Sequence, residues 1–506
     1  MPFFVNLPDL IFISKQSIIN GMQYISEDTI AALSTPAGRS AIAVIRLSGE
    51  NAFSIMRRLF KPSSDADKQV RRGYIMDGDK KVDEVLCSFF KAPRTYTGED
   101  TAEISVHGNP VIINAVLNLL YKNGARAAGP GEFTYRAFLN GKKDLAEAEA
   151  VCSLITSKTE TAAKAALNNV SGEFSNKVRK ELDSMTMLLA YLEASLDYPE
   201  DDIPFLSQEQ KKEMINTAVN NNQKLIDMYK TSKNLQNGLK SAIIGKPNAG
   251  KSSLLNAILG KNRAIVTDIA GTTTDTIEEI IDCRGIPLIL TDTAGIRNHA
   301  ENSIEILGQE RSKEAAGKAD ILLWVFDSSS PLDKNDAEIA AYLKTFDFKD
   351  NMTGVCGKSV LPSKINEKTI KSFEKHTYII GILNKADLPQ KINEENIKTL
   401  AVFDEIISLS AKSGAGMKKL LETVSRLAGV SDAGNEYLLI NSRHQALLRK
   451  AQESLIKTRA LINEENADEL ACFEVKNAAA AMEEVLGVNT PHDILDSIFG
   501  SFCIGK

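Results

Sequence analysis

Hydrophobic and polar positions first indicate a mixed α+β segment between residues 28 and 140. The runs AIAVIRLSG (41–49) and AEISVHGN (102–109) alternate or cluster β-branched residues and run into glycines, which predicts strands. Residues 110–123 carry a helical pattern. Strands followed by helices in one stretch predict an α+β unit.

Helical patterns dominate two later parts of the chain. Apolar residues separated by gaps of three and four positions form one stripe on a long predicted helix. We expect this stripe to pack in the hydrophobic core and to have no catalytic role. Its residues are Phe174, Val178, Leu182, Met185, Leu189, Leu192 and Leu196. After about residue 430, RHQALLRKAQESLIKTRALI and VKNAAAAMEEVLG also predict helices. A last helix is expected to start with Thr490 as N-cap and Pro491 at its first position.

Apolar strands alternate with helices between these two helical parts. SAIIG, IPLIL, ILLWVF, YIIGIL and EIIS predict a doubly wound parallel sheet covered on both faces. We therefore expect a multidomain α/β and α+β chain in which this unit is inserted in a helical domain. The predicted bounds are an extension at 1–22, an N-terminal α+β domain at 23–141, helical parts at 142–237 and 432–506, and the inserted domain at 238–431, with a surface insertion at 348–375.

Composition narrows the class of protein. The chain of 506 residues is longer than a single hydrophobic core usually accommodates, so more than one domain is expected. A content of 43% hydrophobic and 25% charged residues is typical of a globular protein. A formal net charge of −6 argues against a surface that binds nucleic acid throughout, although it leaves room for a local basic patch. No secretory leader and no membrane span are predicted. The cysteines form no CxxC pair, which favours a reducing, cytoplasmic compartment over zinc or disulfides: Cys87, Cys152, Cys283, Cys356, Cys472 and Cys503.

The segment GKPNAGKS (245–252) follows a strand and opens a helix, the context of a phosphate-binding P-loop. Its glycines let backbone amides surround the phosphates. Lys251 is expected to reach the terminal phosphates, and the Ser252 hydroxyl to ligate Mg²⁺.

Two further loops predict which base the bound nucleotide carries. NKAD at 384–387 follows an apolar strand, and its Asp387 can accept the ring N–H and amino protons that guanine offers and adenine lacks. SAK at 410–412 follows the next strand and is expected to close the pocket. Three motifs in this order at the ends of successive strands predict a GTP-binding domain.

Hydrolysis of GTP needs groups beyond those that bind the phosphates and the base. DTAG (292–295) supplies an aspartate near Mg²⁺ and a glycine amide for the γ-phosphate, and GTTTD (271–275) offers threonine hydroxyls. Ile296 stands where Ras-type enzymes hold a water-orienting glutamine. The segment 297–308 leaves three candidates for that task, namely His299, Glu301 and Glu305.

Several motifs together resemble the tRNA-modification GTPase MnmE (TrmE) family from about residue 28 to 506. They include GKPNAGKSSLLN, TDIAGTTTD, DTAGIR, PGEFTYRAFLNGKKDLAEAEA and the terminal FCIGK. The resemblance implies an N-terminal tetrahydrofolate-binding domain and a GTP hydrolase driven by potassium-dependent dimerisation. It also implies that a homodimer works with the FAD-dependent flavoprotein MnmG (GidA) to add an aminomethyl-type or carboxymethylaminomethyl group to C5 of the wobble uridine, position 34, of certain tRNAs. A 5,10-methylene or 5-formyl tetrahydrofolate would be the one-carbon source.

The resemblance also implies roles for individual residues. Potassium would be held by Asn248, Thr267, Ile269 and Thr272, and Mg²⁺ by Ser252 and Thr273. It selects Glu305 as the water-orienting residue, and it places Arg46, Glu103, Lys142 and Lys506 at the folate. The full set expected at GTP is Asn248, Ala249, Gly250, Lys251, Ser252, Ser253, Thr267, Asp268, Ile269, Ala270, Gly271, Thr272, Thr273, Asp292, Thr293, Ala294, Gly295, Asn384, Lys385, Ala386, Asp387, Ser410, Ala411 and Lys412.

Departures and alternatives accompany this assignment. Thr274 replaces the arginine of the family's GTTRD, and Asn109 replaces the second glycine of HGG. Cys503 is a candidate reactive thiol, with simple packing as the alternative. A ribosome-assembly GTPase and a non-catalytic GTP-regulated scaffold are the competing functions, although the chain has one P-loop only and no GxxG clamp after the GTPase domain predicted at 238–431.

Overall fold

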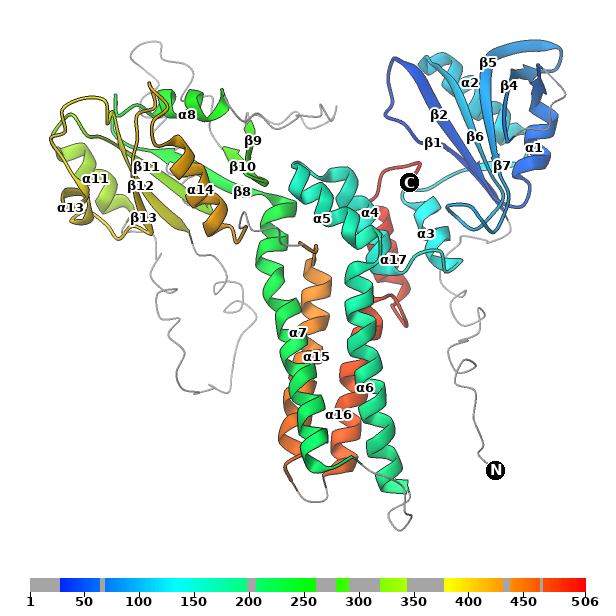
Figure 1. The fold of residues 1–506 in the computed structure, drawn as a ribbon. Coiled ribbons are helices and arrows are strands. Elements are labelled where there is room, and N and C mark those ends of the chain that lie inside the picture. The colour runs from blue at the N-terminus through cyan, green and yellow to red at the C-terminus, as the bar shows by residue number, and fades with distance from the viewer. Residues whose placement is uncertain are drawn as a thin grey trace. The chain divides into compact units, whose positions relative to one another are not determined.

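The computed structural model describes residues 28–63, 69–197, 206–260, 279–290, 319–343, 377–430, 437–464 and 467–506. These residues form two compact units, of which the first contains residues up to 152, 175–206 and 460–506, and the second contains residues 153–174 and 207–459. Figure 1 labels the helices and strands of both units. The expected extension 1–22, the expected insertion 348–375 and residues 261–278 lie outside the described residues. The domain bounds expected from the sequence stay predictions.

The first unit contains a seven-stranded sheet in the order β3-β4-β5-β6-β2-β1-β7. β1 and β7 are parallel, and the other neighbours are antiparallel. The strands are β1 (Thr29–Leu33), β2 (Ser40–Ser48), β3 (Phe60–Pro62), β4 (Val70–Asp77), β5 (Lys80–Phe90), β6 (Thr101–Gly108) and β7 (Ala125–Ala127). The strands expected at 41–49 and 102–109 are thus confirmed as β2 and β6.

Helices α1 (Ala52–Leu59) and α2 (Pro110–Lys122) share a core with this sheet. Alternate residues of β2, Ala43, Ile45 and Leu47, are buried in that core, as the period of a strand requires. Asn109 caps α2, because its side chain accepts a hydrogen bond of 2.9 Å from the Val111 amide. The departure from HGG therefore supplies an N-cap in this chain.

Five more helices belong wholly or mainly to the first unit, namely α3 (Glu132–Leu139), α4 (Leu145–Thr156), α6 (Glu173–Asp197), α16 (Asp468–Val485) and α17 (His492–Gly500). Most of the apolar stripe on α6 is buried or half-buried as predicted, but Leu196 is 44% exposed. The expected cap of α17 is wrong by one residue. Pro491 is the N-cap, and the buried hydroxyl of Thr490 has no hydrogen-bond partner within the described residues.

The second unit is built on a six-stranded sheet in the order β13-β12-β11-β8-β10-β9. Its strands are β8 (Leu239–Ile244), β9 (Glu279–Cys283), β10 (Ile286–Leu290), β11 (Ile321–Asp327), β12 (Tyr378–Asn384) and β13 (Glu405–Ser408). The predicted parallel sheet is confirmed for five strands. The sixth, β9, is an unpredicted antiparallel edge strand joined to β10 by a turn at Arg284 and Gly285, both with positive φ.

Helices accompany this sheet in the order expected. α8 (Lys251–Leu259), α11 (Lys334–Leu343), α13 (Glu394–Lys398) and α14 (Met417–Leu427) come from within the α/β part. α5 (Glu160–Val170) and α7 (Gln208–Asn237) precede it in the chain, and α15 (Ser442–Leu461) follows it. Buried residues form separate clusters that contain opposite faces of β11, with Leu323 and Val325 in one and Trp324 and Phe326 in the other, so both faces are covered.

Candidate functional site

The predicted P-loop lies between β8 and α8. Gly245 and Gly250 have φ values of 148° and 95°, a backbone region that favours glycine. A Cβ on Gly245 would stand 2.3 Å from the carbonyl oxygen of Val325, and one on Gly250 would stand 2.1 Å from Nδ2 of Asn384. Neither position has room for a side chain, so both glycines are required for the loop to pass this close to β11 and β12.

Lys251 begins α8 and points back across the loop. Its Nζ donates to the carbonyl oxygens of Gly245 and Lys246 at 2.7 and 2.9 Å. Burial lowers the pKa of Lys251, since desolvation disfavours the charged form. An anion bound at the N-terminus of α8 would meet backbone amides and this ammonium group together.

Asn384 joins the P-loop to the predicted guanine loops. Its side chain is buried, donates from Nδ2 to the Ala249 carbonyl at 3.0 Å, and accepts at Oδ1 from the Ala411 amide at 3.0 Å. One amide therefore connects all three sequence motifs. The motifs that the sequence placed in one site are adjacent in the structure.

The other guanine-loop residues are oriented by neighbours. The Ser410 hydroxyl donates to Oδ1 of Asp387 at 2.6 Å, and this hydrogen bond keeps the pKa of the exposed Asp387 carboxyl below its usual range. Lys385 pairs with Asp327 at 2.6 Å. Asp387 is thus an exposed, ionised acceptor held in place by Ser410.

A second lysine of the P-loop was missed by the sequence analysis. Lys246 is buried and pairs with Asp336 at 2.9 Å and Asp333 at 3.0 Å, which ties the loop to α11. Burial alone would lower the pKa of Lys246, but the two carboxylates outweigh it and raise the pKa. No motif predicts this contact, because the partners lie about 90 residues away.

Several expected site residues lie outside the described residues. They are Thr267, Asp268, Ile269, Ala270, Gly271, Thr272, Thr273, Asp292, Thr293, Ala294, Gly295 and Glu305. Within the described ranges, no group of three or more His, Cys, Asp or Glu side chains is arranged to hold a metal ion.

In the first unit, the structure brings Arg46 and Glu103 together. They face each other on β2 and β6, and their side chains pair at 2.8 Å with 17% and 30% exposure. The Arg46 guanidinium lies 5.5 Å from the ring centre of Tyr96 and 5.6 Å from that of Phe133. Arg46 is thus held by a carboxylate and two aromatic rings.

The other two expected folate residues contact neighbouring backbone. The Lys142 ammonium donates to the Pro93 carbonyl at 3.0 Å. The Lys506 backbone oxygen accepts from the Phe133 amide at 3.1 Å. The backbone of Lys506 thus contacts Phe133, the residue whose ring faces Arg46.

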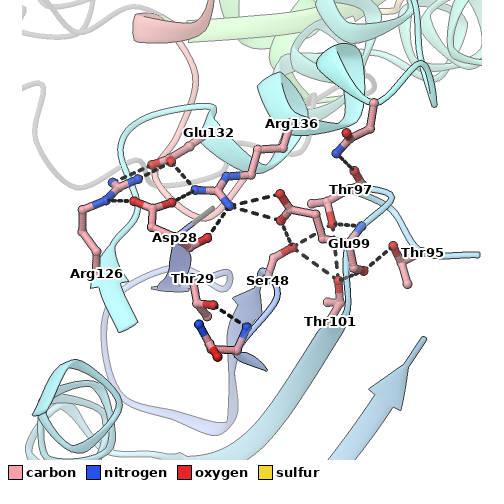
Figure 2. A network of polar contacts seen from close by, with 12 residues as sticks. Asp28, Thr29, Ser48, Thr95, Thr97, Glu99, Thr101, Arg126, Glu132 and Arg136 are labelled. Carbon is pink, nitrogen blue, oxygen red and sulfur yellow. Dashed lines mark hydrogen bonds and ion pairs between the residues drawn. The ribbon is translucent and has the colours of Figure 1, made fainter. Parts of the chain in front are cut away.

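A charged network anchors α3 within the first unit (Figure 2). Arg136 is 5% exposed and donates to Asp28, Glu99 and Glu132, and Arg126 also pairs with Asp28 and Glu132. Burial raises the pKa of Asp28, but the two arginines outweigh it, so the pKa is lowered. These five side chains come from four separate segments, which is why no local sequence pattern predicted them.

Cys503 follows α17 and is exposed. Its carbonyl accepts from the Gly131 amide at 3.4 Å, and the next residue, Ile504, forms an antiparallel bridge with Pro130. The terminal segment therefore lies against the residues that begin α3.

A P-loop that opens a helix from a central parallel strand, with an NKAD and an SAK loop beside it, defines a P-loop GTPase. The family models described as "MnmE helical domain" and "GTP-binding protein TrmE N-terminus" match residues 145–503 and 29–142. The chain belongs to the tRNA modification GTPase MnmE family and is a GTP hydrolase.

Individual relatives agree with this assignment. The tRNA modification GTPase MnmE of Endomicrobium trichonymphae is 57% identical over 96% of this chain and 100% of its own length, and that of Aquifex aeolicus is 38% identical over 95% and 100%. Among solved structures, the cytosolic domain of the T. maritima FeoB iron transporter covers 49% of this chain and 97% of its own at 16% identity, with a TM-score of 0.25, which is too low to support an inference. None of the described helices has the length and apolar character needed to cross a bilayer.

Proposed function

We propose that this chain is a potassium-stimulated GTPase that acts in modification of the wobble uridine of certain tRNAs. With a flavoprotein partner of the MnmG type, it adds an aminomethyl or carboxymethylaminomethyl group at C5 of uridine 34. A tetrahydrofolate derivative supplies the one-carbon unit. The observation that carries the GTP part of this proposal is the buried Asn384 amide, which bridges Ala249 and Ala411.

GTP would occupy the edge of the second sheet where these loops meet. The α8 N-terminus and Lys251 would bind phosphate, and the exposed carboxylate of Asp387 would accept the two guanine protons. Lys385 would lie along the base while its ammonium stays paired with Asp327. Asp387 would act in the ionised form that its hydrogen bond from Ser410 favours.

Two cations would assist hydrolysis. Ser252, in the first turn of α8, is suited to Mg²⁺, with Thr273 as its expected partner. Asn248 has a φ of 62° and is exposed at the tip of the P-loop, which suits a potassium ligand shared with Thr267, Ile269 and Thr272. A monovalent cation there would stabilise negative charge on the phosphates as an arginine finger does. Glu305 would orient water.

The folate part of the proposal rests on Arg46 and Glu103. Both are partly exposed, so a cation and a carboxylate remain accessible beside two aromatic rings, a set that fits a flat heterocycle with an acidic tail. Lys142 and Lys506 would add contacts. Cys503, exposed in the segment bound to the start of α3, would act as a nucleophilic thiolate in the same reaction.

The proposal also includes a homodimer, tRNA as substrate and a cytoplasmic location. The ribosome-assembly GTPase and the scaffold are the alternatives, and they lack wobble-uridine chemistry. Deleting the gene and measuring tRNA nucleosides by mass spectrometry separates all three, because only the proposed function loses the C5 group at uridine 34. An unchanged nucleoside profile would reject it.

The potassium requirement is tested by GTP turnover in KCl and in NaCl at equal ionic strength. We expect a steep rise in KCl for the wild type and a flat response for Asn248→Ala. Asn256→Ala is the matched control, because Asn256 is an exposed residue of the neighbouring helix α8. Equal turnover of the wild type in both salts would contradict the potassium role without affecting the tRNA assignment.

A further inference from the structure

Backbone contacts hold the terminal segment 503–506 against residues 130–133, at the start of α3. Ile504 and Pro130 form an antiparallel bridge. The Gly131 and Phe133 amides donate to the carbonyl oxygens of Cys503 and Lys506 at 3.4 and 3.1 Å. Contacts at both ends of a four-residue segment leave it little freedom to rotate away.

Gly505 brings this segment against the end of β1. Its φ is 93°, and a Cβ there would lie 2.2 Å from the Leu33 carbonyl oxygen and 2.9 Å from Cα of Ser34. The Ser34 hydroxyl donates to the Gly505 carbonyl at 3.1 Å. Any other residue would meet both backbone strain and a steric clash, so glycine is required for the segment to lie against the end of β1.

Gly131, at the start of α3, also occupies a position that only glycine can take. Gly131 has a φ of 64°, and a Cβ on it would lie 2.6 Å from the Phe499 carbonyl oxygen and 3.0 Å from Cβ of Phe502. The rings of Phe499 and Tyr135 pack edge to face at 5.1 Å. The end of α17 and the start of α3 are therefore in direct contact, one turn before Cys503.

The start of α3 is itself fixed relative to Arg46. Glu132 is fully engaged with Arg126 and Arg136 in the charged network (Figure 2), and the Phe133 ring lies against the Arg46 guanidinium. Because the Phe133 amide also holds Lys506, a single residue connects the terminal segment to the Arg46 pair.

We propose that Gly505 is a positioning residue that docks the terminal segment and so sets the place of the Cys503 thiol relative to Arg46 and Glu103. This inference rests on the proposed role of Cys503. Docking determines where the thiol lies, whereas the reaction itself belongs to Cys503 and its substrates. Gly505 therefore affects the tRNA reaction and not GTP hydrolysis.

The test is Gly505→Ala in the full chain, with Gly500→Ala as the matched control. Gly500 lies five residues earlier, and a Cβ there meets nothing within 4 Å. We expect Gly505→Ala to speed hydrogen exchange of the Gly131 and Phe133 amides by about tenfold or more. We expect it to lower C5 modification of tRNA by about 100-fold, the scale of a misplaced reacting group. GTP turnover should stay within about twofold, and Gly500→Ala should match the wild type.

A double variant separates positioning from general stability. If Gly505 acts through Cys503, adding Gly505→Ala to Cys503→Ser lowers modification no further than Cys503→Ser alone. Faster exchange with unchanged modification in Gly505→Ala would overturn the positioning role, and unchanged exchange would overturn the docking itself. If Cys503→Ser keeps full modification, the proposed role of the thiol fails, while the exchange result still decides whether Gly505 docks the segment.

Discussion

Replacing Asn384 with alanine removes the amide that joins the P-loop to the loop at Ala411. The side chain is 2% exposed, so water cannot readily take over its hydrogen bonds. Two backbone groups lose their partners at once, the Ala249 carbonyl and the Ala411 amide, each at 3.0 Å from the Asn384 side chain.

The loss in free energy of unfolding can be estimated from these two backbone groups. A buried polar group left without a partner costs about 1 to 3 kcal/mol, so two such groups cost about 2 to 4 kcal/mol after partial relaxation. With a urea m-value of about 3 kcal/mol/M, this loss lowers the unfolding midpoint of the second unit by about 1 M.

The chain contains its own probe for this unit. Trp324 is the single tryptophan, is fully buried in β11, and pairs in register with Ile244 of β8 and Gly381 of β12. Its ring lies 4.9 Å from that of Phe326. Tryptophan emission against urea therefore reports unfolding of the sheet that carries the P-loop, independently of the first unit.

Asn335→Ala is the control for this experiment, because Asn335 is exposed on α11 of the same unit and its loss should change the free energy of unfolding by less than about 0.5 kcal/mol. A midpoint for Asn384→Ala within about 0.2 M of the wild type would refute the reasoning, since it would show that the amide bridge contributes no net stability.

Two further predictions concern Lys246 and the cysteines. Lys246→Met leaves the fully buried Asp336 without its cation, which should lower the free energy of unfolding by about 3 to 5 kcal/mol in the same tryptophan assay. Lys334→Met, at a lysine that is 90% exposed, is the control and should have little effect. Equal unfolding midpoints for the two variants would contradict a stabilising role of the ion pair between Lys246 and Asp336. Iodoacetamide at pH 8 should alkylate the exposed Cys503 and spare Cys87, because burial raises the pKa of the Cys87 thiol to about 12; peptide mass spectrometry that finds both labelled equally would contradict this.

Asn109 shows how a departure from a family pattern can be explained only by its contacts. The sequence shows only that Asn109 replaces the second glycine of the family's HGG. The structure shows the Asn109 side chain accepting from the Val111 amide at the start of α2, so the replacement supplies an N-cap. A local motif was present, but its use depended on where the helix begins.

Features that depend on interactions between residues close in the chain can be predicted from the amino-acid sequence. The strand, glycine loop and helix at residues 239–259 follow from residues within a few positions of one another, and so do the NKAD and SAK loops and the buried stripe of α6. Hydrophobic period and backbone freedom of glycine act over one or two turns, so their patterns can be interpreted without coordinates.

Contacts between residues far apart in the chain are evident only from the tertiary structure. Asn384 reaches Ala249 across 135 residues, and Ser34 reaches Gly505 across 471. The antiparallel placement of β9 and the network around Arg136 were likewise not predictable from local patterns. Such contacts depend on how whole elements pack and on which loops close, and neither leaves a periodic signal in the chain. The terminal Cys503 segment is the clearest case, because its docking requires the shapes of β1, α3 and α17 together.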